Sequence, residues 1–181
     1  MSQVYVISDL HIGHERIIEF AGNYRDGDTF MENVEHIKQK WNKRVTKKDK
    51  VFVLGDVCMN IHLMPLFDEL HGTKILIRGN HDDFDMSVYT KYFKEIHGLY
   101  RYKRKGFSCW MSHAPIHPDE LRGRINVHGH VHQNSIRVNN MLDDRYVNAC
   151  VENSDGGPIP MDDIVKGIRT WGKVQHFKAA T

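Results

Sequence analysis

The sequence predicts an α/β fold built on a parallel β-sheet. In the first half of the chain, short apolar runs rich in β-branched residues alternate with segments of helical periodicity, a pattern typical of right-handed βαβ units. No repeat, low-complexity tract or Gly/Ser/Pro-rich linker divides the 181 residues. We therefore expect one domain over residues 1–181, long enough to fold around its own hydrophobic core.

Five apolar runs are expected to be strands. They are residues 3–8, 50–54, 74–78, 107–112 and 125–128. Between the first two, Thr29 is a suitable N-cap for a helix whose apolar positions follow the 3.6-residue period as far as Trp41. Residues 61–70 and 86–93 are two further helix candidates.

The second half of the chain is expected to contain β-hairpins. Residues 96–102 and 107–112 flank a basic turn that ends in glycine, which predicts one hairpin. Residues 135–138 and 145–151 flank Asn139-Asn140 and predict another.

A last helix is expected over residues 161–171. Asp162 and Asp163 fall in its first turn, where carboxylates interact favourably with the helix dipole. Gly172 is suitably placed to end it.

Histidine is the one residue type in excess, with 13 in the chain. The net charge is only +2, which excludes a strongly basic nucleic-acid coat and an acidic disordered tail. The apolar runs are too short to span a bilayer, and the N-terminus lacks the pattern of a signal peptide. Cys58, Cys109 and Cys150 lack CxxC spacing, so we expect buried spectator thiols and a cytoplasmic location.

Polar residues follow each of the five predicted strands at the point where the strand ends. The segments are Ser8-Asp9-Leu10-His11, Gly55-Asp56, Gly79-Asn80-His81-Asp82, Ser112-His113 and Gly129-His130-Val131-His132. Ligands of α/β proteins bind at the carboxyl ends of the strands. Five such ends that converge would surround a metal site with Asp, Asn and His side chains.

The number of ligand candidates suits two ions rather than one. The seven candidates are Asp9, His11, Asp56, Asn80, His113, His130 and His132. Mixed oxygen and imidazole ligands favour Mn, our first expectation, or Fe, Zn or Ni; Mg prefers oxygen and is a further alternative. Two divalent ions, two aspartates and a bridging hydroxide leave a net positive charge, which an anionic phosphate substrate requires.

In this order, the five segments resemble the calcineurin-like metallophosphoesterase superfamily. The resemblance covers roughly residues 4–152, and the segment Ser8–His14 resembles the small single-domain bacterial and phage members. It implies a four-layer α/β/β/α sandwich without a cap domain. It also implies two ligand sets, Asp9, His11 and His132 for one ion and Asn80, His113 and His130 for the other, with Asp56 bridging.

One departure from the superfamily concerns protein phosphatases. Protein Ser/Thr phosphatases carry an arginine in the block after the bridging aspartate, whereas this block reads Gly55-Asp56-Val57-Cys58-Met59-Asn60. We therefore do not expect protein phosphatase activity.

The same residues predict a mechanism for phosphoester hydrolysis. A hydroxide shared by the two ions would attack phosphorus in line. His81 lies beside the ligand Asn80 without being a ligand, so we expect it to be the general acid that protonates the leaving oxygen. Asp82 is expected to orient the imidazole of His81 and hold it protonated.

The substrate is expected to be a nucleotide, a cyclic phosphate or a nucleic-acid end, as a monoester or a diester. The candidate substrate contacts are His14, Arg16, Arg78, His117, Arg122 and Arg124. For each of these, a cap, a surface pair or an outward strand position is the alternative. Basic clusters at residues 38–50 and 101–105 leave nucleic-acid binding open, although the first is explained equally well by the solvated end of a helix.

Two other classes of function are alternatives. A noncatalytic scaffold of the same fold would bind metal and a protein partner, but this sequence has all seven ligand types and His81. A histidine-based metal store would have dense histidine tracts, and only His128-x-His130-x-His132 is dense.

Overall fold

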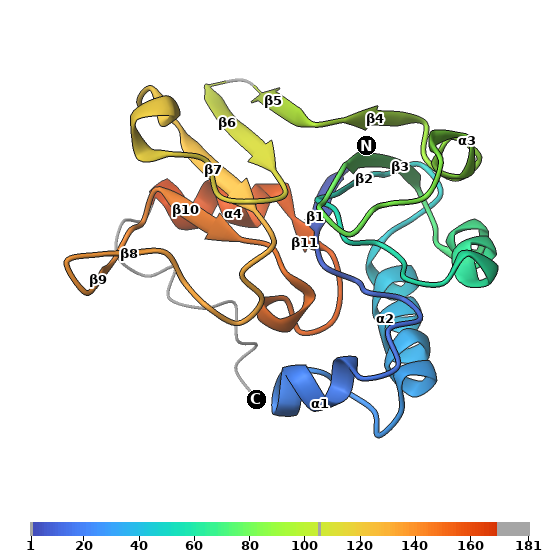
Figure 1. Cartoon of the computed structure of the whole chain (residues 1–181). Coiled ribbons are helices and arrows are strands. Elements are labelled where there is room, and N and C mark those ends of the chain that lie inside the picture. Colours follow the sequence, from blue (N-terminus) through green and yellow to red (C-terminus); the bar gives the residue numbers. More distant parts are fainter. Residues whose placement is uncertain (1, 105, 170–181) are drawn as a thin grey trace.

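The computed structural model describes residues 2–104 and 106–169, apart from the side chains of residues 168 and 169. Two β-sheets lie face to face in it (Figure 1). The first sheet has the strand order β11-β1-β2-β3-β4. Its strands are β1 (Val4–Ile7), β2 (Lys50–Val53), β3 (Thr73–Ile77), β4 (Glu95–His97) and β11 (Ile159–Pro160). β1, β2 and β3 are parallel, as the sequence predicts; β4 adds a fourth parallel strand that was not expected, and β11 is antiparallel to β1.

The second sheet has the strand order β10-β7-β6-β5. Its strands are β5 (Leu99–Arg104), β6 (Phe107–Ser112), β7 (Ile125–His128) and β10 (Tyr146–Asn148). β5 and β6 form the predicted antiparallel hairpin, whereas β7 is parallel to both β6 and β10. A separate small hairpin joins β8 (Arg137–Val138) and β9 (Met141–Leu142).

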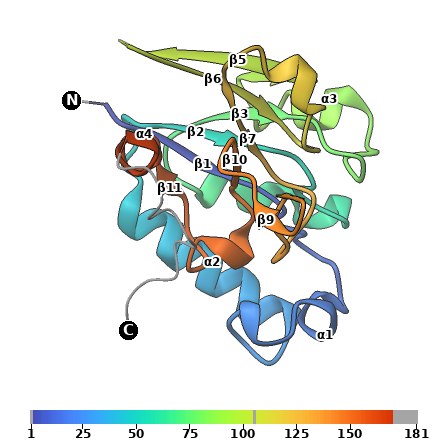
Figure 2. The same ribbon diagram turned by 90° about the vertical axis from the view of Figure 1, so that its left-hand side faces the viewer.

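The longest helix, α2, covers the outer face of the first sheet (Figure 2). Thr29 caps it in a capping box with Glu32, as expected of this residue. The α-helices are α1 (Ile17–Ala21), α2 (Phe30–Arg44), α3 (Met86–Tyr89) and α4 (Met161–Arg169). The 3₁₀ segments are η1 (Gly22–Tyr24), η2 (Ile61–Glu69), η3 (Pro118–Leu121) and η4 (Val151–Asn153). No helix in the described part of the chain is long and apolar enough to cross a membrane.

The first sheet is buried on both faces, because its strands alternate between two hydrophobic cores. In β1, Tyr5 and Ile7 face the core under α2, whereas Val6 faces the core between the sheets. In β2, Val51 and Phe52 divide in the same way.

The layers confirm the predicted fold class, with a thin fourth layer over the second sheet. Asn126 in β7 points away from the core between the sheets and accepts a hydrogen bond from the backbone N–H of Ile116 at 2.9 Å. Arg124 stacks over Trp110 of β6. The loop that carries η3 therefore covers the outer face of this sheet.

Several expected elements have different bounds or partners. Residues 96–102 divide between the two sheets, because β4 pairs with β3 and β5 pairs with β6. Residues 61–69 form a 3₁₀ segment in which Pro65 has no N–H to donate. The helix expected over residues 86–93 ends at Tyr89.

The expected pairing of residues 135–138 with 145–151 is wrong. Asn139 and Asn140 adopt positive φ angles of 50° and 63°, so the chain turns at once and β8 pairs with β9. Residues 146–148 instead extend the second sheet as β10. The last helix begins at Met161 as predicted, and its expected end beyond residue 169 lies outside the described residues.

Candidate metal centre

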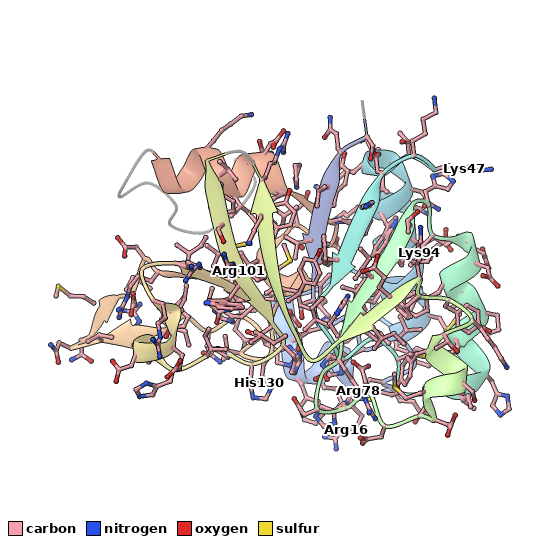
Figure 3. All side chains as sticks on the ribbon, turned by 90° about the horizontal axis from the view of Figure 1, so that it is seen from above. Arg16, Lys47, Arg78, Lys94, Arg101 and His130 are labelled. Carbon is pink, nitrogen blue, oxygen red and sulfur yellow. The ribbon has the colours of Figure 1, made fainter. Side chains whose placement is uncertain are left out.

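The carboxyl ends of strands from both sheets bring the seven ligand candidates together. Two groups hold ligand atoms that all lie within 4.8 Å of one another: Asp9 with His11 and His132, and Asp9 with Asp56 and His113. Figure 3 places His130 at this end of the molecule, together with Arg16 and Arg78. Lys47, which precedes β2, lies toward the opposite end.

The first ligand cluster consists of Asp9, His11 and His132. His11 Nε2 lies 3.7 Å from Asp9 Oδ1, and His132 Nε2 lies 3.9 Å from the same oxygen. The two imidazole rings stack with their centroids 5.1 Å apart. This is the grouping that the family resemblance implies for one ion.

The second ligand cluster consists of Asn80, His113 and His130, with Asp56 beside it. His113 Nε2 lies 2.7 Å from Asn80 Oδ1, 3.1 Å from His130 Nδ1 and 3.4 Å from Asp56 Oδ2. Asp56 Oδ2 also lies 3.7 Å from His11 Nε2 in the first cluster. One carboxylate oxygen of Asp56 therefore faces both clusters.

The chemistry of these atoms fits a pair of divalent cations. Two donors bound at about 2.1 Å to one ion are about 3.0–3.4 Å apart at octahedral or tetrahedral angles, close to the spacings of the second cluster. In the first cluster, Asp9 Oδ1 and His11 Nε2 are buried and have no hydrogen-bond partner among the described residues. Since leaving such atoms unpaired is costly, these residues fit a bound cation.

The protonation of His113 supports the same conclusion. Its Nδ1 donates to the Leu54 carbonyl at 2.7 Å, so in the neutral ring Nε2 carries a lone pair. That lone pair faces Asn80 Oδ1 and Asp56 Oδ2, which are acceptors as well. Burial lowers the pKa of His113, but Asp56 and Asp9 outweigh it and raise the pKa, so this position attracts a positive charge, whether a proton or a metal ion. A cation among the three would turn their mutual repulsion into attraction.

Five ligand candidates have a left-handed backbone conformation. Their φ angles are 58° at Asp9, 48° at His11, 51° at Asp56, 72° at His130 and 50° at His132. This region costs a non-glycine residue roughly 1–3 kcal/mol and occurs preferentially at functional sites. The strand ends are thus strained where the ligand side chains leave them.

Glycines before three ligands allow the strand ends to approach one another. A Cβ on Gly129 would lie 1.9 Å from Ser8 Oγ, and one on Gly79 would lie 2.3 Å from Asp56 Oδ1. Gly55 has a φ of 89°, a backbone conformation that residues with a side chain rarely adopt. A side chain at any of these positions would separate the strand ends that carry the ligands.

The buried ion pair between Arg25 and Glu152 supports the first ligand cluster through a hydrogen bond to His132. Glu152 Oε1 lies 2.9 Å from His132 Nδ1, which keeps the proton on that nitrogen and leaves Nε2 for a metal. Arg25 donates to the same oxygen from Nε and Nη2 at 2.9 and 2.7 Å. Arg25 also donates to the backbone carbonyls of Asp9 and Leu10 at 2.5 and 2.9 Å, so it holds the segment that carries the ligands.

The aspartates of the site remain ionised despite their burial. Burial by itself would raise the pKa of Asp9, but hydrogen bonds and the neighbouring imidazoles outweigh it and place the pKa well below the usual range. Asp56 shows the same balance, with His113 and the backbone N–H of His81 lowering its pKa. The hydrogen bond to Glu152 raises the pKa of His132.

His81 is anchored next to the site through its backbone. Its N–H donates to Asp56 Oδ1 at 2.9 Å, and its ring lies 5.9 Å from that of His11, centroid to centroid. The residue is exposed, so its side chain is accessible to a substrate.

The role expected for Asp82 is corrected by the structure. Its carboxylate is fully buried and accepts hydrogen bonds from the backbone N–H groups of Asp56, Val57 and Gly79 at 2.8–3.0 Å. These bonds join the loops after β2 and β3, so Asp82 positions the loop that carries Asp56. Among the described residues it makes no hydrogen bond to His81.

The candidate substrate contacts fall into two groups. His14 lines a cavity of about 310 Å³ beside His11, His81 and His132. Arg16 lies next to this cavity, over the ring of Phe20, which is one of its walls. Arg78 is exposed and donates to the carbonyl of Asp82 at 2.8 Å.

The other three candidates lie on or next to η3. His117 caps η3, Arg122 faces Glu120 at 3.5 Å, and Arg124 stacks on Trp110. None of the three lines the described cavity. Their role in substrate binding remains a prediction.

Sequence reasoning missed Arg25, Glu152 and Cys150. All three cysteines are free and buried as expected, but Cys150 is more than a spectator, because its Sγ donates to Asp9 Oδ2 at 3.1 Å. Arg25 and Glu152 are 127 residues apart in the chain. Arg25 follows no predicted strand, and Glu152 follows the expected strand over residues 145–151, whose predicted hairpin pairing is wrong. The signal available for Glu152 was its place directly after the apolar residues Cys150 and Val151, like the ligand candidates that follow the other strands.

Comparison with known proteins gives consistent similarities. The family model described as calcineurin-like phosphoesterase matches residues 2–169. An uncharacterized protein of Methanocaldococcus jannaschii is 30% identical over 96% of this chain and 95% of its own length. The gene 66 protein of Mycobacterium phage L5 is 36% identical over 45% of this chain and 41% of its own length.

A solved structure shows the same fold. A protein of unknown function from Aquifex aeolicus has a TM-score of 0.74 and 28% sequence identity, over 92% of this chain and 99% of that chain.

Proposed function

Because this chain belongs to the calcineurin-like phosphoesterase family, we propose that it is a dinuclear-metal-dependent phosphoesterase that hydrolyses phosphate monoesters or diesters. The observation that carries this proposal is the pair of ligand clusters that share Asp56 Oδ2, 3.7 Å from His11 Nε2 and 3.4 Å from His113 Nε2. A structural metal site needs only one closed set of about four ligands. Six ligand candidates around the shared carboxylate of Asp56, next to a cavity, favour catalysis.

The roles of the metal ligands follow from their places in the two clusters. Asp9, His11 and His132 would hold one ion, Asn80, His113 and His130 the other, and Asp56 both. When bound, two divalent ions activate water for attack and offset the charge of the phosphate. Manganese remains our first expectation, with iron, zinc, nickel or magnesium as alternatives.

His81 would protonate the leaving oxygen. Its hydrogen bond to Asp56 fixes its backbone beside the centre, and its ring lines the cavity. A diester or alkyl ester leaves as a basic alkoxide, which needs a proton more than an acidic phenolate does. We expect His14, Arg16 and Arg78 to contact the phosphate, because His14 lines the cavity, Arg16 lies over the lining residue Phe20, and Arg78 lies at the same end of the molecule. A cytoplasmic location remains part of the proposal.

An activity assay with controlled metal content tests the proposed function. Protein freed of metal with EDTA and then supplied with Mn²⁺ should hydrolyse bis-p-nitrophenyl phosphate or p-nitrophenyl phosphate, and EDTA should abolish the activity. An Asp56→Asn variant should lose it at every metal concentration. Bound metal without hydrolysis of either ester would contradict the proposal and favour the noncatalytic scaffold.

A further inference from the structure

The cavity beside the metal centre has two chemically different walls. One wall is apolar and consists of Ile17, Phe20 and Ala21 of α1 with Met59. The other wall is polar and includes His14, Gln133 and Asn134. The ligand candidates His11 and His132 also line the cavity, so one molecule could fill it and reach the ligand clusters at the same time.

Phe20 is unusual among the apolar residues of α1. Its side chain is 58% exposed, although its neighbours Ile17 and Ala21 are buried. Arg16 lies over the ring, 4.9 Å from its centroid, and the His14 ring meets it edge to face at 5.7 Å. An aromatic ring that stays exposed beside these contacts at a cavity wall is suited to stacking on a flat ligand.

The polar wall limits which flat or apolar groups fit. Neither side-chain amide of Gln133 and Asn134 has a hydrogen-bond partner among the described residues. A plain hydrocarbon group would bury these amides without partners, and a sugar alone would leave the apolar wall facing water. A nucleobase has both a π-face and a polar edge, and its size suits a cavity of about 310 Å³.

We propose that this cavity binds the base of a nucleoside phosphate ester, with Phe20 as the stacking surface and Gln133 and Asn134 at the polar edge of the base. The inference rests on the proposed phosphoesterase function and names the class of its substrate. The ester phosphate would then lie in the part of the cavity lined by His81, His11 and His132.

Three esters with the same p-nitrophenol leaving group test this proposal. They carry thymidine (through its 5′ oxygen), a benzyl group or a methyl group on the same p-nitrophenyl phosphate. In the Mn²⁺-loaded wild-type protein, kcat/KM should be highest for the thymidine ester. Phe20→Ala should lower the ratio of thymidine to methyl ester by about 5- to 150-fold, the range that corresponds to loss of one base–aromatic stack.

The control variant is Leu99→Ala on β5, because Leu99 is 49% exposed and does not line the cavity. It should leave the ratio unchanged. Equal rates for the benzyl and thymidine esters, or an unchanged ratio in Phe20→Ala, would overturn the nucleobase assignment while leaving the phosphoesterase function intact. Absence of hydrolysis of all three diesters and of the monoester p-nitrophenyl phosphate would instead contradict the proposed function.

A binding measurement tests the cavity without catalysis. The fluorescent nucleoside 2-aminopurine riboside should bind to EDTA-treated protein with quenching of its emission, as stacking on an aromatic ring produces. Phe20→Ala should weaken this binding and Leu99→Ala should not. Equal binding by both variants would contradict the proposal even if neither variant is active.

Discussion

At the scale of single residues, Asp56 is the side chain that connects the two ligand clusters. Its Oδ2 faces His11 and His113, while its Oδ1 accepts from the backbone of His81. Asp82 holds its backbone, and Gly79 leaves room for its carboxylate. Several elements therefore fix one side chain, as expected where the geometry of a metal centre has to be preorganised.

Glu152 should control metal affinity without binding metal. In Glu152→Gln the side chain keeps its shape but loses the charge that fixes the proton on His132 Nδ1, so metal affinity should fall by roughly 10- to 100-fold. Competition with a chromogenic chelator measures this affinity. Glu35→Gln, at an exposed position of α2, is the matched control. A metal affinity equal to that of wild type in Glu152→Gln would show that the hydrogen bond between Glu152 and His132 does not support the site.

The loss of activity in a His81→Ala variant should depend on the leaving group of the ester. His81→Ala should lose about 10²–10⁴-fold in kcat on an alkyl phosphate ester and much less on the p-nitrophenyl ester. The exposed His62→Ala on η2 serves as control. Equal losses on both esters would exclude His81 as the general acid and indicate a role in substrate binding.

The seven ligand candidates could be identified in the sequence because each follows a predicted strand end, where residue type and sequence position carry the signal together. The residues that position the ligand candidates, Arg25, Glu152 and Asp82, were not identified in this way. The bond between Arg25 and Glu152 exists only once α2, the segment after β1 and η4 have packed together. The role of Asp82 was misjudged because its neighbour in sequence, His81, is not its partner in space.

At the scale of elements, Asp49 ties the beginning of β1 to the turn before β2. It accepts hydrogen bonds from the backbone N–H groups of Gln3 and Thr46 and from the Thr46 hydroxyl, at 2.7–2.8 Å. Burial alone would raise its pKa, but these bonds outweigh it and lower the pKa below 3.8. The charged form is therefore favoured in the folded state.

Asp49→Asn should destabilise the fold in a pH-dependent way. Because the folded-state pKa is depressed, the carboxylate stabilises the fold fully above the unfolded pKa, and this contribution disappears as the pH falls through the folded pKa. Urea unfolding should thus show a larger difference between wild type and variant at pH 7 than at pH 2–3. A difference that does not change with pH would mean that the hydrogen-bond geometry matters and the charge does not.

The periodicity of the sequence predicted the parallel strands and α2 well, because both bury continuous apolar surface. The same periodicity did not predict which strands pair, because strand pairing depends on contacts that form only in the folded chain. Glu95–His97 and Leu99–Arg104 are separated in the sequence only by Gly98, and residues 96–102 were expected to form one strand, but the two segments join different sheets. β11 has two residues, Ile159 and Pro160, too few to show a period, and its pairing with β1 becomes evident only in the folded chain.

At the scale of the whole molecule, metal binding should contribute to stability. The buried carboxylates and unpaired imidazole nitrogens of the site belong to both sheets, so ions bound there would link the sheets. A ligand present at about 100 times its Kd stabilises the folded state by about 2.7 kcal/mol, or roughly 5–10 °C in Tm for a chain of this size. Mn²⁺ should raise the Tm of EDTA-treated protein by this amount.

Ca²⁺ at the same concentration should raise the Tm much less, because the site offers imidazole nitrogens that calcium binds poorly. An equal shift with both ions, or no shift with Mn²⁺, would contradict the assignment of the imidazoles as ligands.

The central claim is that two ions share Asp56, and anomalous diffraction from Mn²⁺-soaked crystals tests it most directly. The account predicts two peaks roughly 3.5–4 Å apart, the separation usual for two-metal sites. One should be bound by Asp9, His11 and His132, the other by Asn80, His113 and His130, and Asp56 should contact both. A single peak, or two peaks that Asp56 does not join, would contradict the account.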